Sequence, residues 1–453
     1  MERSRRDFLK KGCATLGAGA FFARLSAVEA LAAQHHHVRL APATDYKALV
    51  CVFLNGGNDA WNTIVDLDDY ASYAATRASI AQPQASLLPI RPPSDGRTFG
   101  IHPSLAGLHT LWGQQRMAVL CNVGPLVEPI TRNLYQTRPD LRPPNLFSHS
   151  DQVHQWHTSV SAHVLQTGWA GRTADHTLGL NEGSALPMVV SVAGSSVFGT
   201  GSITRVFETT PSGTVGLSGS NTSSSSRARY DGMRQLLGMN REAVFVRVMG
   251  DTITKALDYD RILTAALGNA PPLVTLFPTT TLGNQLRMVA RLVSVRIALA
   301  VKRQIFFVSL GGFDTHGGQI AAQNGLLSDV GHSLAAFDEA MVELGVGSQV
   351  TTFTCSDFGR TYRSNGEGTD HGWGSCHFVM GGAVRGGDFY GRWPNLALAG
   401  PDDSGSNGRF IPTTSVEEYG ATLALWYGLA STDLPAVFPN IGRFDSPSLG
   451  FLD

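Results

Sequence analysis

The chain has 453 residues, 43% of them hydrophobic, and its formal net charge at pH 7 is −1. This length is enough for one large domain or two ordinary domains with a sizeable buried core. The near-zero net charge excludes non-specific binding to nucleic acid, which requires a basic surface. The 50 glycines indicate many tight loops rather than a helical bundle.

The N-terminal segment has the pattern of a twin-arginine export signal. Arg5 and Arg6 precede an apolar stretch that ends in the small-residue pattern Ala-Leu-Ala. Because the residues around Cys13 lack the apolar character of a lipidation box, we expect cleavage without a lipid anchor. The sequence therefore predicts a Tat signal peptide over residues 1–33, transport by the Tat translocase, and a periplasmic or secreted product. No later apolar run is long enough to form a stable membrane span.

Five apolar runs after residue 45 have the length of buried strands. They are residues 48–57, 116–124, 187–194, 304–312 and 349–357. A helical pattern separates the last two runs, and this rhythm of strand and helix predicts an α/β fold. We expect a mostly parallel central sheet with helices on both faces, in which the chemistry lies at the carboxyl ends of the strands.

The rest of the chain supplies loops and a helical segment. Residues 211–226 are low in complexity and indicate a surface loop. Residues 227–303 are largely helical in pattern and predict a side subdomain or insertion of a single domain that covers residues 45–453. Four cysteines remain after the signal, and an apolar setting makes most of them small core residues. A disulfide is compatible with the periplasm but is not required.

Polar clusters follow several of the predicted strands, where this fold places its catalytic loops. A single Asp/His pair is more often a hydrogen-bonded turn, but several pairs at one sheet edge favour a metal site. The side chains that we expect at this edge are Asn55, Asp59 and Asn62 after the first strand, Ser148, His149, Ser150 and Asp151 after the second, Asp314 and His316 after the fourth, Asp357 and Arg360 after the fifth, and Asp370, His371 and His377 beyond it.

These residue types suit divalent cations. Aspartate and histidine are ligands of zinc and manganese, whereas aspartate with serine and water suits magnesium or calcium. Two ions about 4 Å apart would clamp the attacking and leaving oxygens of an in-line displacement. The sequence predicts a divalent-metal site and leaves the identity of the metal open.

Two further residues each have a catalytic and a structural interpretation. Ser148 opens a helical pattern, so its hydroxyl is a candidate nucleophile beside helix amides that face a phosphate or sulfate, or else a plain helix cap. Arg360 has a planar fork that binds a tetrahedral oxyanion bidentately. Its structural alternative is a salt bridge to Asp357 or Asp370.

Several motifs together resemble a known family. They are "FLNGGNDAWNT", "SHSDQ", "TGWAGR", "GGFDTHGGQ", "SDFGRT", "GTDHGWG" and "VMGGAVRGGDFYG". They are similar to the bacterial exported proteins of the domain-of-unknown-function family 1501, over essentially the whole mature chain. That family in turn resembles the alkaline phosphatase and sulfatase superfamily, which implies an alkaline phosphatase-like fold and a metal-dependent hydrolase or phosphotransferase.

The resemblance implies particular roles. Asp59 matches the first-strand aspartate that binds a metal, and Ser148 matches the helix-opening nucleophile, with Ser150 as its competitor. Asp314 and His316 match the aspartate and histidine of one metal, although the superfamily spacing is usually wider.

The chain also departs from the superfamily pattern. Asp357 stands where an Asp-His pair is usual, and Phe358 replaces the histidine, which puts a second metal in doubt. His371 supplies the last histidine of the pattern. Because no Cys-x-Pro-x-Arg motif is present, the usual formylglycine sulfatase is disfavoured.

The sequence thus predicts an exported metal-dependent hydrolase that acts on a small-molecule or polymer phosphate or sulfate ester. The alternative is a non-catalytic periplasmic binding or assembly protein that keeps the fold and a structural metal. The Asp-Phe pair favours the alternative, and the retained Asp, Ser, His and Arg residues favour the enzyme.

Overall fold

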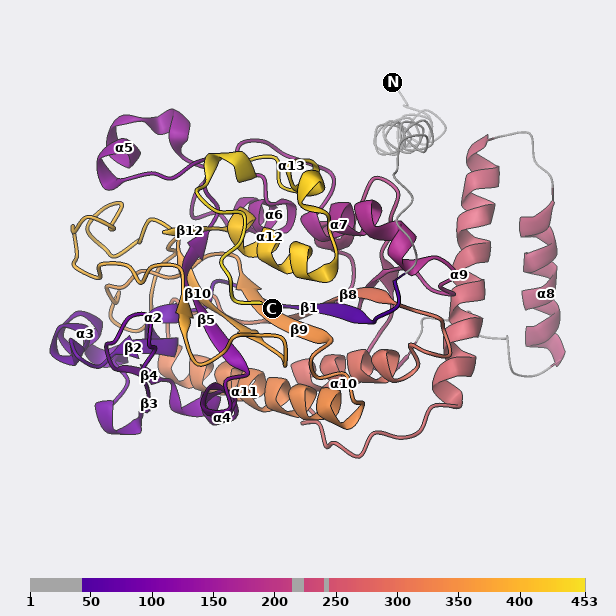
Figure 1. Cartoon of the computed structure of the whole chain (residues 1–453), viewed down its shortest axis with the longest axis horizontal. Coiled ribbons are helices and arrows are strands. Elements are labelled where there is room, and N and C mark those ends of the chain that lie inside the picture. The colour runs from indigo at the N-terminus through magenta and orange to yellow at the C-terminus, as the bar shows by residue number, and fades with distance from the viewer. Residues whose placement is uncertain (1–42, 214–223, 240–243, 453) are drawn as a thin grey trace, which may run out of the picture.

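The computed structural model describes residues 43–213, 224–239 and 244–452 (Figure 1). The predicted signal peptide and most of the low-complexity loop at 211–226 lie outside these residues. In Figure 1 a central sheet separates two helical layers, and the helices α8 and α9 project from one end of the molecule.

Within the described residues, nine strands form the central sheet, in the order β11-β5-β10-β9-β1-β8-β6-β7 with β12 beside β5. The strands are β1 (Lys47–Asn55), β5 (Met117–Gly124), β6 (Val189–Ser191), β7 (Phe207–Glu208), β8 (Arg303–Gly311), β9 (Val350–Ser356), β10 (Ser375–Met380), β11 (Phe389–Tyr390) and β12 (Thr414–Ser415).

The middle of the sheet is parallel, as the sequence predicts. β1 pairs in parallel with β8 and β9, so that Asn55 lies opposite Gly311 and Leu54 lies opposite Ser356. The carboxyl ends of these three strands therefore meet at one edge. β10 runs antiparallel to both β5 and β9, and the sequence pattern did not indicate this strand. The predicted α/β class with a mostly parallel sheet is confirmed.

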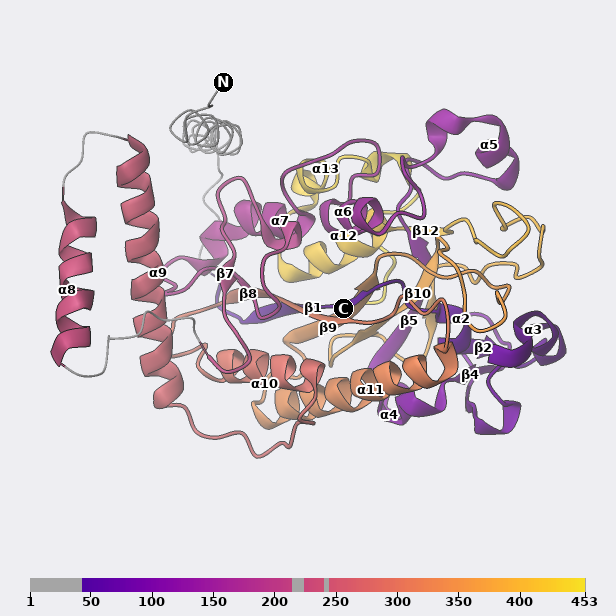
Figure 2. The ribbon, with the colours of Figure 1, turned by 180° about the vertical axis from the view of Figure 1, so that it is seen from behind.

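Helices cover both faces of the sheet, and Figure 2 shows the same two layers from behind. One layer holds α4 (Ala106–Gly113), α10 (Thr281–Ser294) and α11 (Gln319–Glu343), and the other holds α6 (His149–Thr158), α7 (Trp169–Thr177), α12 (Val416–Tyr427) and α13 (Leu434–Val437).

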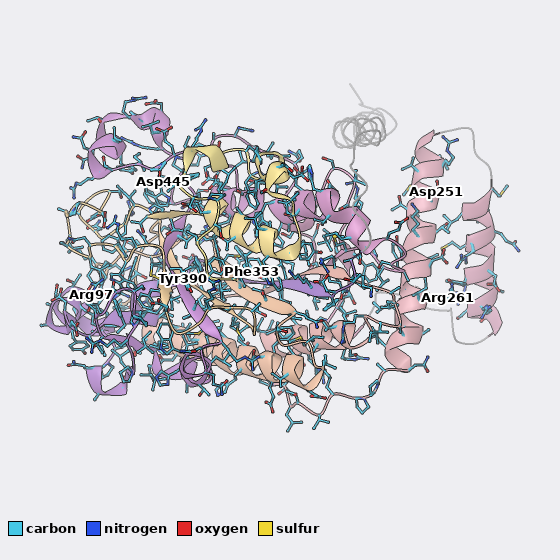
Figure 3. All side chains as sticks on the ribbon, in the orientation of Figure 1. Arg97, Asp251, Arg261, Phe353, Tyr390 and Asp445 are labelled. Atoms are coloured by element: carbon cyan, nitrogen blue, oxygen red, sulfur yellow. The ribbon has the colours of Figure 1, made fainter. Side chains whose placement is uncertain are left out.

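The alternation of side chains along β1 explains the two layers. Ala48, Val50 and Val52 belong to one buried cluster, which includes residues of α10 and α11. Leu49 and Cys51 belong to a second cluster, which includes residues of α7 and α12. Since successive strand residues face opposite sides of a sheet, a strand that is apolar throughout must be covered on both faces. Figure 3 shows the side chains that fill both layers.

Smaller elements surround this core. The strands β2 (Ile64–Asp66), β4 (Phe99–Ile101) and β3 (Leu88–Ile90) form an antiparallel sheet. The helices α2 (Ala60–Thr63), α3 (Tyr70–Arg77) and α5 (Arg132–Thr137) lie in the connections. The four cysteines of the described chain, Cys51, Cys121, Cys355 and Cys376, are buried free thiols.

The helices α8 (Ser224–Gly238) and α9 (Val244–Gly268) form an arm that extends away from the sheet in both views (Figures 1 and 2). Figure 3 marks Asp251 and Arg261 on this arm. Leu257 and Leu263 of α9 are buried, so the second half of that helix fixes the arm to the body. Among the helices that the structure describes, none is long and apolar enough to cross a membrane.

Candidate metal centre

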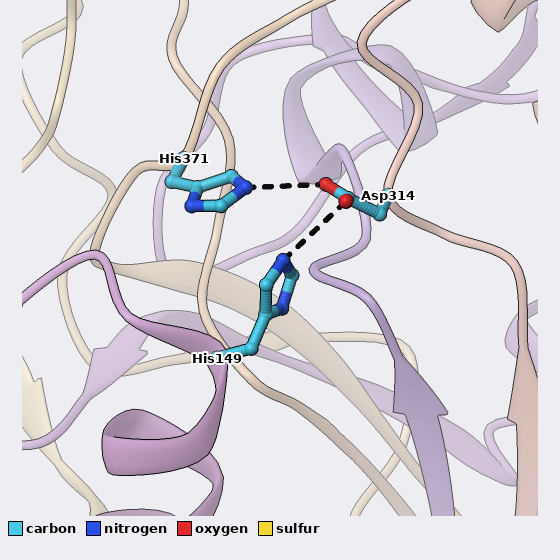
Figure 4. Close-up of side chains that lie close together, drawn as sticks. All are labelled: His149, Asp314 and His371. Carbon is cyan, nitrogen blue, oxygen red and sulfur yellow. Dashed lines mark hydrogen bonds and ion pairs between the residues drawn. The ribbon is translucent and has the colours of Figure 1, made fainter.

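Three histidines converge on Asp314 at the carboxyl edge of the sheet. The Nε2 atoms of His316 and His371 lie 3.0 and 3.2 Å from its Oδ1 atom, and Nε2 of His149 lies 3.5 Å from its Oδ2 atom. Ligand atoms of His149, Asp314 and His371 all lie within 4.8 Å of one another (Figure 4). These three residues form a group that could hold a metal ion.

Glycine allows the loops after β1 and β8 to touch at this site. Gly56 has a φ of +117°, and a Cβ atom there would lie 2.5 Å from the backbone nitrogen of Asp314. Because only glycine fits both the dihedral angle and the close approach, Gly56 of the "NGG" after β1 is required for Asp314 to reach its position.

His149 is oriented by a buried carboxylate. This residue begins α6, and its Nδ1 atom lies 2.7 Å from Oδ2 of Asp357. The other oxygen of Asp357 accepts a hydrogen bond of 2.8 Å from the backbone N–H of Gly56. Burial raises the pKa of Asp357, although these two hydrogen bonds partly oppose the shift. The Nε2 atom of His149 is buried and has no hydrogen-bond partner in the described structure, so it is available to a ligand.

His371 is oriented by the backbone. Its Nδ1 atom lies 2.7 Å from the carbonyl oxygen of Phe147, whose φ of +72° lies in the left-handed region that favours glycine. The guanidinium of Arg409 stacks 4.4 Å over the Phe147 ring and donates a hydrogen bond of 2.9 Å to the carbonyl oxygen of His371. Burial lowers the pKa of His371, which favours the neutral ring that binds metals.

His316 is the most exposed of the three histidines, with 45% of its side chain accessible. Its Nδ1 atom lies 3.2 Å from Oδ1 of Asp370, and its Nε2 atom lies 2.9 Å from Nε2 of His371. Asp370 also accepts a hydrogen bond from the Asn365 amide. Asp370 therefore lies behind His316, as Asp357 lies behind His149.

Arg360 bonds to protein atoms with all three guanidinium nitrogens. Nη1 donates to Oδ1 of Asp314 at 2.8 Å and to the carbonyl oxygen of Gly56, while Nε and Nη2 donate to Thr369. Its side chain is fully buried. Burial opposes ionisation of Asp314, but the hydrogen bond and charge of Arg360 outweigh it, and the pKa of Asp314 lies below its ordinary value. Neither predicted alternative describes this arrangement, because the fork holds Asp314 rather than a substrate, Asp357 or Asp370.

Ser148 lies beside the centre, since both of its neighbours, Phe147 and His149, contact it. Its hydroxyl donates to Oδ2 of Asp151 at 2.5 Å and makes no capping bond to the α6 amides. Ser150 is exposed, and its oxygen lies 3.2 Å from that of Ser148. Hydrogen bonds from Ser148 and Asn145 hold the pKa of Asp151 below its ordinary value.

Phe358 packs against two histidines of the centre. Its buried ring lies 4.7 Å from the rings of both His149 and His371. A phenyl group offers no ligand atom, so this position contributes packing that holds the two imidazoles rather than a site for a second ion.

The structure does not bring Asp59 and His377 to the centre. Asp59 is buried beside α2, where its carboxylate accepts hydrogen bonds from Arg77, Gln319 and the backbone of Trp61. The guanidinium of Arg77 thus compensates the charge that we expected a metal to compensate.

His377 lies on β10 and points into the core, where its ring centre is 4.9 Å from that of Trp156. Its direction follows from the pairing of β10 with β5, in which His377 lies opposite Leu120. No local pattern indicated this strand. None indicated the support from Phe147 and Arg409 either, because neither residue type is a metal ligand.

The sequence as a whole matches a known protein family. A family model described as "Protein of unknown function (DUF1501)" matches residues 46–416. The chain belongs to this family. The resemblance predicted from the motifs of this DUF1501 protein is therefore confirmed. Among curated proteins, no sequence matches the chain.

Three solved structures show a remote likeness to this DUF1501 protein. The soluble domain of lipooligosaccharide phosphoethanolamine transferase A from Neisseria meningitidis is 8% identical, with a TM-score of 0.34 over 85% of this chain and 89% of the other. The PsFucS1 sulfatase from Pseudoalteromonas sp. is 9% identical, with a TM-score of 0.33 over 91% and 72%. The phosphonate monoester hydrolase of Agrobacterium radiobacter is 9% identical, with a TM-score of 0.31 over 85% and 74%. At these values the likenesses assign neither activity nor substrate to this chain.

Proposed function

We propose that this protein is an exported metal-dependent hydrolase of phosphate or sulfate esters, with Ser148 as its nucleophile. The observation that carries the proposal is the convergence of three imidazole nitrogens on Asp314. In each of the three rings, the other nitrogen faces an acceptor, which is Asp357, the Phe147 carbonyl or Asp370.

The donor set fits a transition metal. An acceptor behind a histidine fixes its ring and raises the basicity of the nitrogen that faces the metal. Imidazole nitrogens with one carboxylate suit zinc or manganese, whereas magnesium and calcium prefer oxygen ligands. The Nε2 atom of His149, which has no hydrogen-bond partner in the described structure and lies 3.5 Å from Oδ2 of Asp314, fits the same interpretation. We therefore favour zinc or manganese, held by His149, Asp314 and His371, with His316 as the fourth candidate ligand.

A divalent cation at this position would supply Lewis-acid stabilisation of the charge on the ester oxygens. Ser148 Oγ attacks the phosphorus or sulfur atom, and its proton passes to the carboxylate of Asp151, which it already contacts. The amides at the start of α6 face the oxyanion, because the Ser148 side chain does not occupy them. The bond to the leaving-group oxygen breaks, and that oxygen takes up the proton that Asp151 accepted. Water then hydrolyses the ester formed on Ser148, which releases phosphate or sulfate and restores the serine hydroxyl.

The roles of the two arginines and two aspartates follow from their contacts. Arg360 positions Asp314 and neutralises part of its charge, and Arg409 holds the Phe147 turn against His371. Asp357 and Asp370 hold the rings of His149 and His316. None of these four groups needs to contact the substrate.

The test begins with the exported protein purified without a histidine tag. Elemental analysis should find about one zinc or manganese ion per chain, and an aryl phosphate or aryl sulfate should be hydrolysed. Ser148→Ala should lower turnover by at least about 100-fold while leaving metal content and melting temperature unchanged. Ser150→Ala is the matched control and should keep its activity. Full activity of Ser148→Ala would show that Ser148 is not the nucleophile. A covalent intermediate on Ser150 would assign the nucleophile to Ser150 instead.

The second candidate function is a non-catalytic binding or assembly protein with a structural metal. The complete burial of Arg360 favours it, because the arginine expected to bind an oxyanion is not free to do so. Stoichiometric metal without turnover of either ester class would select this function.

The proposal includes export by the Tat translocase to the periplasm or beyond. The twin arginine at Arg5 and Arg6 supports it. Replacement of both by lysine should retain the precursor in the cytoplasm, as followed by fractionation and immunoblotting. A mature form that still reaches the periplasm would contradict this route.

A further inference from the structure

The end of the arm where α8 leads to α9 exposes an unusual number of large apolar side chains. We define the arm tip by five of them, which are between 39% and 60% exposed: Leu236, Met239, Val246, Val248 and Met249. Single exposed apolar residues are ordinary, but contiguous patches mark interaction surfaces.

The tip residues are contiguous across both helices. A groove of about 300 Å³ on the arm is lined only by apolar side chains and one glycine. Leu236 and Leu237 of α8 line it together with Val246, Met249 and Ile253 of α9. The apolar surface therefore runs along the groove and out to the tip.

The tip of α9 is exposed both at the groove and on the side turned away from it. Residues 246–249 are four consecutive positions of α9, and all four are exposed. Successive residues of an α-helix point about 100° apart, so Arg247 and Val248 project away from the groove that Val246 and Met249 line. A fluid lipid layer can contact the groove and the outer side of the helix at the same time, whereas a single protein partner would cover one of them.

The size of the patch also argues against a second copy of this chain. A stable protein interface uses about 20–30 residues on each side, and the tip offers five large apolar residues. Shallow insertion of an apolar helical surface into a lipid interface needs no such area.

The basic charge of the arm tip favours an anionic lipid surface. Arg247 is exposed between Val246 and Val248, whereas two of the three arginines of α8 are ion-paired, Arg227 with Asp231 and Arg234 with Asp258. The basic residue that lies within the tip is therefore Arg247. Arginine extends its apolar stem along the insertion and keeps its guanidinium at the level of the phosphates. Basic residues beside an apolar surface favour anionic lipids.

We propose that the arm tip docks the protein on the surface of an anionic phospholipid bilayer. The apolar side chains lie below the phosphates, and Arg247 lies among them. The arm and α2, which follows β1 at the carboxyl edge of the sheet, lie at opposite ends of the long axis (Figures 1 and 2). The docking surface therefore lies at the other end of the molecule from the metal centre, and the inference does not depend on the proposed hydrolase.

The experiment is vesicle flotation of protein recovered from the periplasm, with phosphatidylglycerol–phosphatidylcholine vesicles compared with phosphatidylcholine alone. Wild type should float with the anionic vesicles and lose binding as salt increases. The double variant Val248→Asp/Met249→Asp should bind at least about 10-fold more weakly, and Arg247→Glu should bind more weakly and depend less on salt. Ile297→Asp is the matched control, because Ile297 is 80% exposed but lies outside the arm.

All variants share the same N-terminus, so any difference in vesicle binding between them is caused by the substitution in the arm. Equal binding by the wild type and the double variant, or no binding of wild type to anionic vesicles, would overturn the proposal. A wild-type dimer in light scattering that becomes monomeric in the double variant would overturn it in favour of a second copy. An unchanged melting temperature would show that the double variant is folded.

Discussion

Two pairs of histidines have opposite environments. His149 and His371 lie at the candidate metal centre, and His157 and His377 lie in the core, although each core histidine is close in sequence to one of the first pair. His149 and His157 lie on the same helix, α6, and His371 and His377 are six residues apart. His149 and His371 each hold one nitrogen against an acceptor at 2.7 Å and turn the other toward Asp314.

The second pair lies in the core. His157 packs among aromatic rings that include Phe53 and Phe307, and neither ring nitrogen of His377 has a hydrogen-bond partner in the described structure. Burial lowers the pKa of His157 and of His377 to about 3. His157 also holds its Nδ1 atom 3.3 Å from the Ser196 hydroxyl, so a held nitrogen does not by itself make a ligand. The difference teaches that a ring becomes a candidate ligand where the fold also turns its other nitrogen toward Asp314, as it does for His149 and His371.

The largest expected effect separates His371 from His377. His371→Ala should remove bound metal and hydrolysis, whereas His377→Leu should keep both, as measured by elemental analysis and turnover. A ligand that binds only the folded state stabilises it by about 4 kcal/mol at a thousandfold excess over its Kd. A chelator should therefore lower the Tm of wild type and of His377→Leu, but not that of His371→Ala. His316→Ala should weaken metal binding in the same direction.

Equal loss of metal in His371→Ala and His377→Leu would contradict the division into two pairs. An undiminished chelator effect in His316→Ala would remove that residue from the centre.

The next prediction tests whether the carboxylate that orients the His149 ring contributes to metal affinity. Asp357→Asn keeps the shape of the side chain but removes the charge behind His149, and metal affinity should fall by about 10- to 100-fold. Titration calorimetry would measure it. Asp338→Asn is the control, because Asp338 is also a buried, ion-paired aspartate, bound to Arg116 on a different part of the fold. Unchanged affinity in Asp357→Asn would show that the ring of His149 needs no orienting carboxylate.

A smaller effect concerns the core pair and pH. The folded protein keeps His377 neutral down to about pH 3, whereas the unfolded chain binds a proton below its ordinary pKa of about 6.5. The unfolded state therefore binds more protons, and the free energy of unfolding should fall by about 2 kcal/mol between pH 6.5 and 5 from this residue alone. His377→Phe should remove that part of the slope in denaturant titrations with chelator present. An identical slope in the variant would show that the ring is protonated or solvated in the folded state.

The smallest predicted effect is a loss of stability as pH rises, which is the opposite of the His377 prediction. It tests whether burial also favours the neutral form of an acidic side chain. Glu417 of α12 is buried, and burial raises its pKa to about 8. The folded state then holds a proton that the unfolded state releases, so stability is full below the ordinary pKa of glutamate and falls as pH rises toward 8. The expected loss is about 1 kcal/mol between pH 6 and 7. Glu417→Gln should remove it, and a variant that loses stability equally over this interval would contradict the assignment.

The fold was largely predictable because long apolar runs are local signals. All five predicted runs contain a strand of the central sheet, and the limits of β1, β8 and β9 differ from the predicted ranges by one to two residues. β10 was missed because its short segment, Ser375–Met380, begins with polar residues and a histidine. These side chains are buried only because β5 and β9 flank them, which no local pattern reveals.

The candidate centre was predictable in composition but not in detail. The motif order indicated Asp314, His316 and His371, whereas Asp59 and Arg360 have structural partners that the pattern did not indicate. Arg77, which binds Asp59, lies 18 residues away in the chain, and Asp314 lies 46 residues from Arg360. A charged side chain in a buried position bonds to whichever opposite charge the fold brings near it.

The sequence by itself determined the export signal as a prediction, the parallel sheet, and the edge at which polar residues collect, because charge, apolar length and glycine position act within a few residues. The motif order indicated His371, and only the tertiary structure decided that His149 lies at the centre and His377 in the core. All four imidazoles have the same intrinsic chemistry, and what separates them is that the fold turns one nitrogen of His149 and of His371 toward Asp314 and places an acceptor behind the other nitrogen. Those acceptors lie 208 residues from His149 and 224 residues from His371 along the chain, so only folding brings them together.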